Sequence, residues 1–470
     1  MVIGRIADGI VEGVDSATAR VTGLFGPPVL RLGVTGLARA GKTVFITSLV
    51  ANLMDRGRMP GLQAAASGAI RAVWLQPQPD DTVPRFAYES HLAALTGQPP
   101  AWPESTRAVS QLRLSFKVQP TGLFGALSGA RTLHLDIVDY PGEWLLDLGL
   151  MEQDFATWSE TVLATAARRD EAAPFRAALA ETDLQARLEE PAAERLAAAY
   201  TAYLRAARAA GYSDCTPGRF LMPGEMAGSP ALTFAPLPPG PAPRGSLARE
   251  MARRFEAYKA RVVQPFFREH FARIDRQVVL VDLLDAIHSG PRALADLATG
   301  LDRTLAAFRP GRASWLGQVL GQRRVERILF AATKADHVHH TQHGAMADIL
   351  QAMLRQARDR ASFAGARTEA MALAALRATV EEEREHGGRR LPMVRGVLMD
   401  GREAALYPGR LPEEPSRVLS AASAGAERWL EGDYSVMRFR PPGTGLRPGE
   451  GPPHIRLDRA AEFLIGDRLR

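Results

Sequence analysis

The sequence predicts an α/β fold, in which a mostly parallel β-sheet with helices on both faces is interrupted by an inserted α-helical subdomain. Strand-like and helix-like segments alternate along the chain, which is typical of a parallel sheet covered by helices. A glycine-rich turn joins the first of these strands to the first helix. Residues 143–211, between two strands, are rich in Ala, Leu, Glu and Arg with helical periodicity, and they predict the insertion.

The expected strands carry apolar residues in alternation or in short continuous runs. Strands of the sheet are predicted at residues 27–36, 110–118, 131–142, 276–284, 327–336 and 371–379. Shorter strands are expected at residues 393–399 and 434–440, and helices at residues 44–57, 246–273 and 457–469. Residues 58–102 are expected to form a long irregular connection.

We expect five structural segments in the chain. They are an N-terminal amphipathic helix, the first part of the sheet domain, the helical insertion with a Pro- and Gly-rich loop, the second part of the sheet domain, and a C-terminal extension packed on it. Their predicted limits are 1–28, 29–142, 143–271, 272–400 and 401–470.

The N-terminal segment has one apolar helical stripe, made by Ile6, Ile10, Val14, Ala17 and Val21. A helix packed on the body of the protein is the first interpretation of this stripe. Peripheral contact with the inner membrane, or with a partner helix, is the alternative.

The composition is that of a globular protein, with 46% apolar and 23% charged residues in 470. A net charge of +6 permits contact with nucleic acid, but arginine content alone supports it and we do not expect such binding. Cys215 is the single cysteine, so an intrachain disulfide is excluded. The sequence contains neither a signal peptide pattern nor an apolar run that could span a membrane, and it predicts a cytoplasmic protein.

Residues 36–43, GLARAGKT, match the phosphate-binding pattern G-x-x-x-x-G-K-[ST]. Gly36 and Gly41 allow successive N–H groups to face phosphate oxygens, and the following helix adds the positive end of its dipole. Lys42 is expected to reach the β- and γ-phosphates, and the Thr43 hydroxyl to bind Mg²⁺. Leu37, Ala38, Arg39, Ala40 and Val44 complete the predicted phosphate contact.

Lysine is rare in this chain, which supports a function for Lys42. Only four of the 58 basic residues are lysines, and the others are arginines. A planar guanidinium is too bulky to replace an ammonium group in this loop. Arg39, inside the same loop, is predicted either to stabilise transition-state charge or to face solvent.

The segment DYPGE at 139–143 predicts a metal ligand and a γ-phosphate sensor. Asp139 ends a strand, where α/β sheets bind ligands, and is expected to hold Mg²⁺ directly or through water. Gly142 would offer its N–H group to the γ-phosphate. Glu143 is predicted either to orient or deprotonate the attacking water or to stabilise a helix N-terminus.

A second strand, VVLVD, also ends in a carboxylate that could serve as the metal ligand. Asp282 or Asp285 in that role would indicate an ordinary ATPase. Asp139 is preferred because its segment also supplies the glycine sensor, and VVLVD is then the next strand of the core.

The sequence TKAD at 333–336 matches the base-specificity pattern [NT]-K-x-D. The Asp336 carboxylate can accept hydrogen bonds from the guanine N1–H and amino groups, and adenine would leave it unpaired. Lys334 is expected to lay its apolar stem over the base. Thr333 stands where asparagine is usual, and a surface turn is the alternative interpretation.

Two further parts of the site are expected near these motifs. Arg377 and Ala378 are predicted to give backbone N–H groups to the guanine O6. Ser105 or Thr106 is predicted to supply a switch hydroxyl to Mg²⁺, and Thr106 is the choice that we carry forward.

The segment HVHHTQHG groups His337, His339, His340 and His343. A loop or helix-start role is the first interpretation, and a metal site is the alternative. Cys215 is expected to be inert. Trp102 and Pro103 are expected to anchor the long first connection by packing.

With these residues in hand, the chain resembles the YcjX-like family of bacterial P-loop NTPases. The resemblance rests on GLARAGKTVFITSLV, DYPGEWLLDL, TPGRFLMPGE, ATKADHVHHTQH and IRLDRAAEFLIGD, and it covers most of the chain. It implies a GTPase-like nucleotide domain with a helical insertion and GTP or GDP bound at the matched positions. Family members are often described as ATPases, and the family is loosely linked to stress response near the cell envelope.

The sequence therefore predicts an enzyme that binds GTP with Mg²⁺, hydrolyses it slowly and switches conformation for an unknown protein partner. The segments at 100–106 and 139–150 are expected to order around the γ-phosphate. An ATPase of the same fold and a scaffold that binds nucleotide without hydrolysis remain the alternatives.

Overall fold

The computed structural model describes residues 27–36, 40–104, 108–119, 129–212, 214–306, 325–355, 366–424, 434, 439–443 and 449–470. The predicted helix within residues 1–28, residues 37–39 of the phosphate loop and the switch candidates Ser105 and Thr106 lie outside these ranges. Most of the expected strand at 434–440 also lies outside them.

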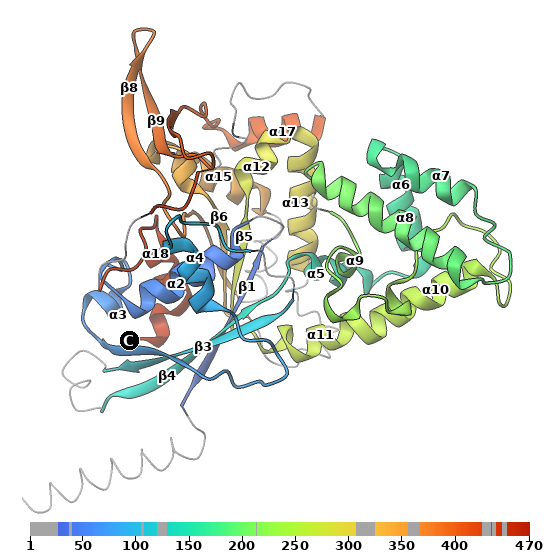
Figure 1. Ribbon diagram of the computed structural model, residues 1–470, viewed down its shortest axis with the longest axis horizontal. Coiled ribbons are helices and arrows are strands. Elements are labelled where there is room, and N and C mark those ends of the chain that lie inside the picture. Colours follow the sequence, from blue (N-terminus) through green and yellow to red (C-terminus); the bar gives the residue numbers. More distant parts are fainter. Residues whose placement is uncertain are drawn as a thin grey trace, which may run out of the picture.

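A seven-stranded sheet forms the centre of the molecule, in the order β2-β3-β4-β1-β5-β6-β7 (Figure 1). The four pairs from β4 to β7 are parallel, whereas β3 is antiparallel to both β2 and β4. The strands are β1 (Val29–Gly36), β2 (Ile70–Gln76), β3 (Ser110–Val118), β4 (Arg131–Asp139), β5 (Arg276–Val281), β6 (Arg327–Ala332) and β7 (Arg367–Ala372). The predicted α/β fold with a mostly parallel sheet is thus confirmed.

Each face of the sheet is covered by its own set of helices. Alternate residues of β1, such as Leu30, Leu32 and Val34, pack with α2 (Lys42–Met54) and α18 (Leu457–Ile465). On the other face, Val279 and Val281 of β5 pack with α12 (Leu283–His288), α13 (Pro291–Ala306) and α15 (His343–Met353). This alternation is the period of two expected of strands that are buried on both faces.

The chain between β4 and β5 is helical and forms a lobe beside the sheet (Figure 1). Its helices are α5 (Glu143–Leu146), α6 (Phe155–Ala166), α7 (Ala173–Ala180), α8 (Glu190–Ala209), α9 (Gly218–Leu221), α10 (Leu247–Tyr258) and α11 (Gln264–Glu269). Aromatic side chains fill the lobe: the rings of Trp158 and Phe255 stack 4.8 Å apart. The apolar core of the lobe is continuous with that of the second sheet face, so the lobe packs directly on the sheet domain.

Two parts of the sheet differ from the sequence-based prediction. Residues 58–102 are not irregular, because they contain β2, α3 (Gln63–Ala66) and α4 (Tyr88–Thr96). β2 was missed because it is an edge strand with little alternation in burial. The last strand of the sheet, β7, ends at Ala372, so only Met371 and Ala372 of the predicted strand at 371–379 are confirmed and the remainder is wrong.

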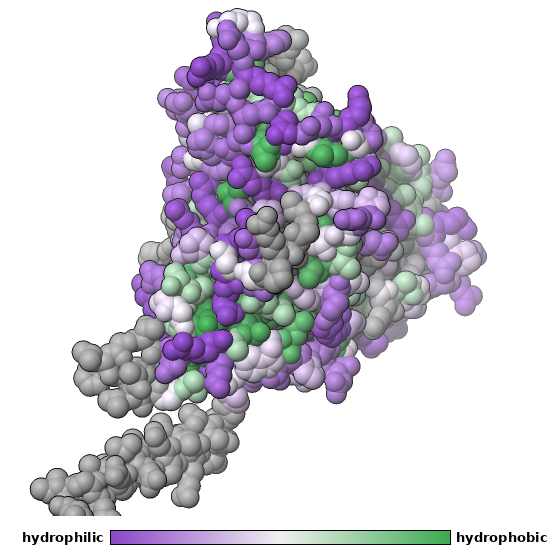
Figure 2. Space-filling view, turned by 60° about the vertical axis from the view of Figure 1, so that its left-hand side comes forward, coloured by the Kyte–Doolittle hydropathy of each residue, from purple (hydrophilic) through white to green (hydrophobic). Residues whose placement is uncertain are grey.

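A small antiparallel sheet, β8 (Val380–His386), β9 (Arg389–Val397) and β10 (Glu403–Leu406), extends away from the main sheet (Figure 1). β9 contains most of the predicted strand at 393–399. Gly387 and Gly388 form the turn of the β8–β9 hairpin with φ values of 57° and 74°, which suit glycine. The outer end of this hairpin is covered mainly by hydrophilic side chains (Figure 2).

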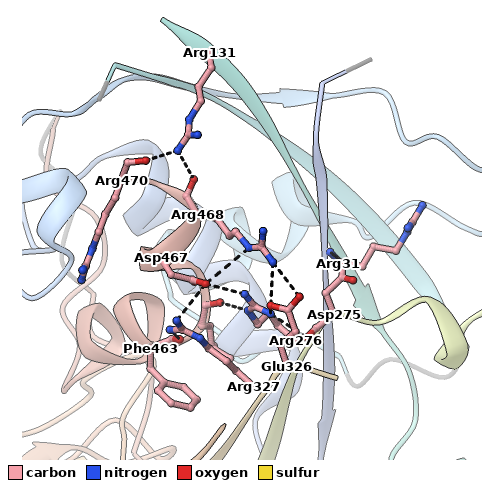
Figure 3. Close-up of polar contacts among 11 residues, drawn as sticks. Arg31, Arg131, Asp275, Arg276, Glu326, Arg327, Phe463, Asp467, Arg468 and Arg470 are labelled. Atoms are coloured by element: carbon pink, nitrogen blue, oxygen red, sulfur yellow. Dashed lines mark hydrogen bonds and ion pairs between the residues drawn. The ribbon is translucent and has the colours of Figure 1, made fainter. Parts of the chain in front are cut away.

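The C-terminal segment closes the edge of the sheet where β5 and β6 begin (Figure 3). Arg276, at the start of β5, is fully buried, and its Nε donates to the Leu464 carbonyl of α18 at 3.0 Å. The same guanidinium forms ion pairs with Glu326 and, at 2.9 Å, with Asp467. A buried guanidinium is stable only with such partners, so Arg276 fixes α18 to the sheet.

Replacing Arg276 with methionine keeps the volume of the side chain but removes every one of these hydrogen bonds. We expect the free energy of unfolding to fall by about 1–3 kcal/mol, because the Leu464 carbonyl loses its donor inside the protein. Chemical denaturation of the purified variant would measure this. Arg468→Met is the control, since Arg468 and Glu326 pair at 2.9 Å with 47% of each side chain exposed, and such pairs contribute about 0–1 kcal/mol. Equal losses in both variants would contradict the assignment.

The described helices lack the combination of length and apolar character that is needed to cross a lipid bilayer.

Candidate functional site

A cavity of about 420 Å³ opens where the start of α2, the turn after β6 and the segment after β7 meet. It brings together residues from the phosphate loop and from the base-specificity motif. Its described lining is Ala40, Gly41, Lys42, Thr43, Val44, Phe45, Trp102, Pro103, Thr333, Lys334, Asp336, His337, Ala374, Ala375, Leu376, Met399 and Phe439.

The two glycines of the phosphate loop are required for different reasons. At Gly36, a Cβ atom would lie 2.8 Å from the backbone oxygen of Leu280, so the close packing of β1 on β5 excludes a side chain. Gly41 has open space around it, but its φ of 83° is in the left-handed region. Leu37, Ala38 and Arg39 lie outside the described residues.

Lys42 and Thr43 begin α2 and face the cavity. The Lys42 Nζ donates to the Gly36 carbonyl at 3.1 Å, which holds the ammonium group across the loop. The Thr43 hydroxyl donates to the Glu104 carbonyl at 3.5 Å, and so connects the loop to the segment before β3. Both groups therefore lie at the positive end of the α2 dipole, where phosphate oxygens bind favourably.

Asp139 and Gly142 lie beside the phosphate loop, not in the lining of the cavity. Asp139, the last residue of β4, is paired in register with Val34 of β1 and is buried. Gly142 precedes α5 directly. Because β4 and β1 are parallel neighbours, the Asp139 carboxylate and the phosphate loop follow the same end of the sheet.

Glu143 is directed into the helical lobe in this structure. It is 3% exposed, and its Oε1 forms an ion pair of 2.8 Å with Arg208 Nη2 of α8. The carboxylate thus joins the segment after β4 to the insertion. Of the two predicted roles, the structure shows the residue at a helix start.

Asp147, four residues later, makes a second connection to the lobe. Its carboxylate accepts hydrogen bonds from the Gly218 N–H at 2.7 Å and from the Tyr258 hydroxyl at 2.5 Å. Burial raises the pKa of Asp147 to about 6 from an ordinary 3.8, although both hydrogen bonds favour the ionised form. Arg219, next to Gly218, lies 3.1 Å over the Trp144 ring, so DYPGEWLLD and TPGRF pack against each other.

The raised pKa of Asp147 predicts a pH dependence of stability. Because the folded pKa is above the unfolded value, the stabilisation by protonated Asp147 is complete below pH 3.8 and is lost as the pH rises through about 6. Asp147→Asn keeps the shape without the charge. From pH 5 to 7.5, wild type should lose roughly 1–1.5 kcal/mol of stability relative to this variant, which is about half of the effect of the whole pKa shift. Thermal unfolding of both proteins across this range would measure the difference, and parallel pH profiles would contradict it.

The base-specificity motif contributes Thr333, Lys334 and Asp336 to the lining of the same cavity as the phosphate loop. Asp336 is 4% exposed, and its Oδ2 accepts a hydrogen bond from the Ala378 N–H at 2.9 Å. Thr333 is buried, and its hydroxyl donates to the Val281 carbonyl at 3.2 Å. These contacts hold the turn after β6 against β5 and the segment after β7.

The predicted use of Arg377 and Ala378 needs correction. The Arg377 N–H donates to the Pro453 carbonyl at 2.7 Å, and the Ala378 N–H donates to Asp336. Both donors are therefore used within the protein. The cavity is lined instead by residues 374–376, two to three positions earlier, because the strand ends sooner than predicted.

Asp282, the competing candidate for the metal ligand, has other partners in the structure. Its carboxylate forms an ion pair with Lys334 and caps α12 by accepting from the Asp285 N–H at 3.3 Å. Lys334 has a φ of 60°, in the left-handed region, so the backbone changes direction shortly after β6 ends. VVLVD is a core strand, as preferred from the sequence.

Several aromatic and apolar residues of the cavity were not predicted to belong to it, among them Trp102, Met399 and Phe439. Trp102 was expected only to anchor its segment, and its Nε1 does donate to the Phe439 carbonyl at 2.8 Å. Trp102, Met399 and Phe439 also form part of the cavity lining. They come from three distant segments, so no local sequence signal groups them.

The predicted histidine cluster divides into separate roles. His343 begins α15, and its Nε2 contacts the Ala335 carbonyl at 2.8 Å, in agreement with a helix-start role. His337 lies edge-on to the Phe439 ring at 5.6 Å, and burial lowers its pKa. Cys215 is buried, which raises its pKa to about 12 and makes a reactive thiolate unfavourable.

Comparison with known proteins agrees with the motifs. The sequence model of the YcjX-like family, DUF463, matches residues 30–469. The Ras-like GTPase YcjX of Escherichia coli (strain K12) is 39% identical over 457 residues, covering 94% of this chain and 96% of that protein. The Ras-like GTPase YcjX of Shewanella oneidensis is 36% identical over 467 residues, covering 94% of each.

Proposed function

Because the chain belongs to the YcjX-like family, we propose that it is a GTPase-like nucleotide-binding protein that hydrolyses GTP slowly with Mg²⁺. The observation that carries the proposal is the single cavity lined by both Lys42 and Asp336. One group suits a terminal phosphate and the other suits a purine edge. Relatives named Ras-like GTPases support the same conclusion.

The base end of the cavity favours guanine over adenine. The Asp336 carboxylate can accept from both the N1–H and the amino group, whereas adenine presents an acceptor at N1. Lys334, whose ammonium is paired with Asp282, would cover one face of the base with its stem. In place of Arg377 and Ala378, the N–H groups of residues 375 and 376 are our candidates for the guanine O6.

The phosphate end has donors that suit Mg²⁺. The Thr43 hydroxyl and the Asp139 carboxylate are hard oxygen ligands at the ends of neighbouring elements. We expect these two residues to hold the ion, with Thr106 as a further candidate. When bound, Mg²⁺ supplies neutralisation of the β- and γ-phosphate charge.

Hydrolysis would proceed by attack of water on the γ-phosphorus, in line with the bond to the leaving GDP oxygen. The proton of the water passes to a phosphate oxygen, and GDP and phosphate are released. Lys42, and Arg39 if it faces the phosphates, would stabilise the developing charge. Glu143 could orient the water only after it separates from Arg208, because that ion pair turns it into the helical lobe.

The Glu143–Arg208 and Asp147–Tyr258 contacts suggest how nucleotide state reaches the insertion. Both acidic residues follow Gly142, the proposed γ-phosphate sensor, within five positions. A shift of this segment on loss of the phosphate would move α8 and α10, which carry the partner residues. The moved helices are the expected output to a protein partner.

Two measurements test the proposal. Calorimetric titration in the presence of Mg²⁺ should show tighter binding of GTP and GDP than of ATP. The purified protein should also release phosphate from added GTP over a period of hours. Hydrogen exchange of residues 143–211 should differ between the GTP-analogue and GDP states. Tighter binding of ATP than of GTP would indicate an ATPase of the same fold, and absence of phosphate release would indicate a scaffold that only binds nucleotide. Equal hydrogen exchange in the two nucleotide states would contradict the conformational switch.

A further inference from the structure

His339, His340 and Glu381 converge outside the nucleotide cavity. One ligand atom from each lies within 4.8 Å of the other two. His340 Nδ1 lies 2.6 Å from Glu381 Oε2, and His339 Nε2 lies 3.8 Å from the same oxygen. We propose that these three side chains form a binding site for a divalent transition-metal ion of the zinc type.

The spacing of these atoms fits such an ion after a small adjustment. Zinc bonds to imidazole nitrogen and carboxylate oxygen are about 2.0–2.2 Å, so ligand atoms at tetrahedral angles are roughly 3.3–3.5 Å apart. The two distances to Glu381 Oε2 lie on either side of this value. Rotation of exposed His340 alone would open the shorter contact, since 63% of its side chain is accessible.

The rings are supplied by neighbouring residues of one turn, but the carboxylate is not local. His339 precedes the 3-10 turn at His340–Gln342 and is buried, whereas Glu381 lies on β8. The imidazole rings are 4.2 Å apart with a 40° tilt between them, and one nitrogen of each lies within 4.8 Å of the other. Forty-one residues of sequence separate His340 from Glu381, so tertiary structure creates the cluster.

A polar neighbour can fix the ring of His339 in the orientation that a metal requires. The Thr341 hydroxyl lies 3.0 Å from His339 Nδ1, and the Thr341 N–H donates to the same nitrogen at 3.5 Å. Metal binding through Nε2 would place the imidazole proton on Nδ1, with the Thr341 hydroxyl as its nearer acceptor in place of the longer N–H contact. Partners of this kind on the second ring nitrogen are usual for metal-binding histidines.

The charges around the cluster determine the class of ion. Two imidazoles and one carboxylate match zinc and similar ions, whereas Mg²⁺ and Ca²⁺ prefer oxygen ligands. Arg377 Nη2 lies 3.7 Å from Glu381 Oε1 and reduces the negative potential, which further disfavours a hard cation. The exposed side of His340 leaves room for water as a fourth ligand.

A bound ion would connect the two segments that surround the base-recognition residue. Asp336 lies three residues before His339. Its carboxylate accepts a hydrogen bond from the Ala378 N–H, and its backbone carbonyl accepts one from the Thr379 hydroxyl, both just before β8. The metal would add a second connection between the same segments. This site does not depend on the proposed GTPase function, since none of its ligands lines the cavity.

Zinc binding by the full-length protein tests the inference directly. The protein should be free of any histidine tag and dialysed against a chelator before titration with Zn²⁺ in competition with a chromogenic chelator. We expect one tight site per chain, a rise in thermal stability with Zn²⁺, and no comparable response to Mg²⁺ alone. Co²⁺ should give the visible absorption of a tetrahedral site.

Variants distinguish this cluster from the remaining histidines. His340→Ala and Glu381→Gln should abolish the tight site, and Thr341→Val should weaken it by about 10- to 100-fold. His386→Ala, an exposed histidine of the same strand β8, should bind zinc as wild type does. Absence of tight zinc binding in wild type, unchanged binding in His340→Ala and Glu381→Gln, or equal loss in His386→Ala would overturn the proposal. Far-ultraviolet circular dichroism confirms that each variant is folded.

Discussion

Lys42→Ala is expected to lower the rate of GTP hydrolysis by about 10³-fold or more, because no other described ammonium group lines the phosphate end of the cavity. In the structure this group already lies across the loop, 3.1 Å from the Gly36 carbonyl. Single-turnover phosphate release with saturating GTP and Mg²⁺ would measure the loss.

Lys117→Ala is the matched control for this experiment. Lys117 is another of the four lysines and is exposed on β3, away from the cavity lining. Its replacement should leave hydrolysis unchanged. If Lys42→Ala retained the wild-type rate, the phosphate would have to bind elsewhere and the proposed mechanism would be wrong.

Asp336→Asn should weaken GTP binding by roughly 10²- to 10⁴-fold. The carboxylate would lose two charge-assisted hydrogen bonds to guanine, each contributing about 1.5–3 kcal/mol. The same variant should gain affinity for xanthosine triphosphate. Xanthine has a carbonyl in place of the amino group, and the asparagine amide can donate to it. Competition binding with GTP, ATP and xanthosine triphosphate would measure all three changes.

The gain for xanthine separates base recognition from general damage to the fold. Asp336 also accepts from Ala378, so a loss of GTP binding alone could follow from a displaced loop. Asp348→Asn, on the exposed face of α15, serves as the control and should bind as wild type does. A variant with weaker binding of every nucleotide would contradict the assigned role of Asp336.

The parts of the site that follow strands could be predicted from the sequence, because their function depends on local geometry. Gly36 ends the buried strand β1, Lys42 begins the helix that follows it, and Asp336 lies in the turn after β6. Residue spacing alone identifies such junctions. The cluster of histidines at 337–343 could also be recognised from the sequence. Glu381, which completes the proposed site, could not be predicted, because it lies on β8, 41 residues further along the chain, and only the folded structure brings it near His340.

The walls of the cavity and the role of Glu143 could not be predicted for a related reason. Trp102 and Phe439 meet through a hydrogen bond between segments 337 residues apart. Glu143 follows Gly142, where a water-orienting residue is expected, and only its contact with Arg208 of α8 shows the alternative. By contrast, the β8–β9 hairpin could have been found, since Gly387 and Gly388 are a common turn signal.

The position of α18 has a consequence for synthesis of the protein in the cell. The Asn52 amide on α2 donates to the Pro452 carbonyl across 400 residues of chain, and α18 packs on the same sheet face as α2. At about 5–20 residues per second, a ribosome needs roughly 20–80 seconds to cover that distance. During this time the apolar face that receives α18 is open to water, so we expect the nascent chain to present this surface to chaperones until α18 has been synthesised.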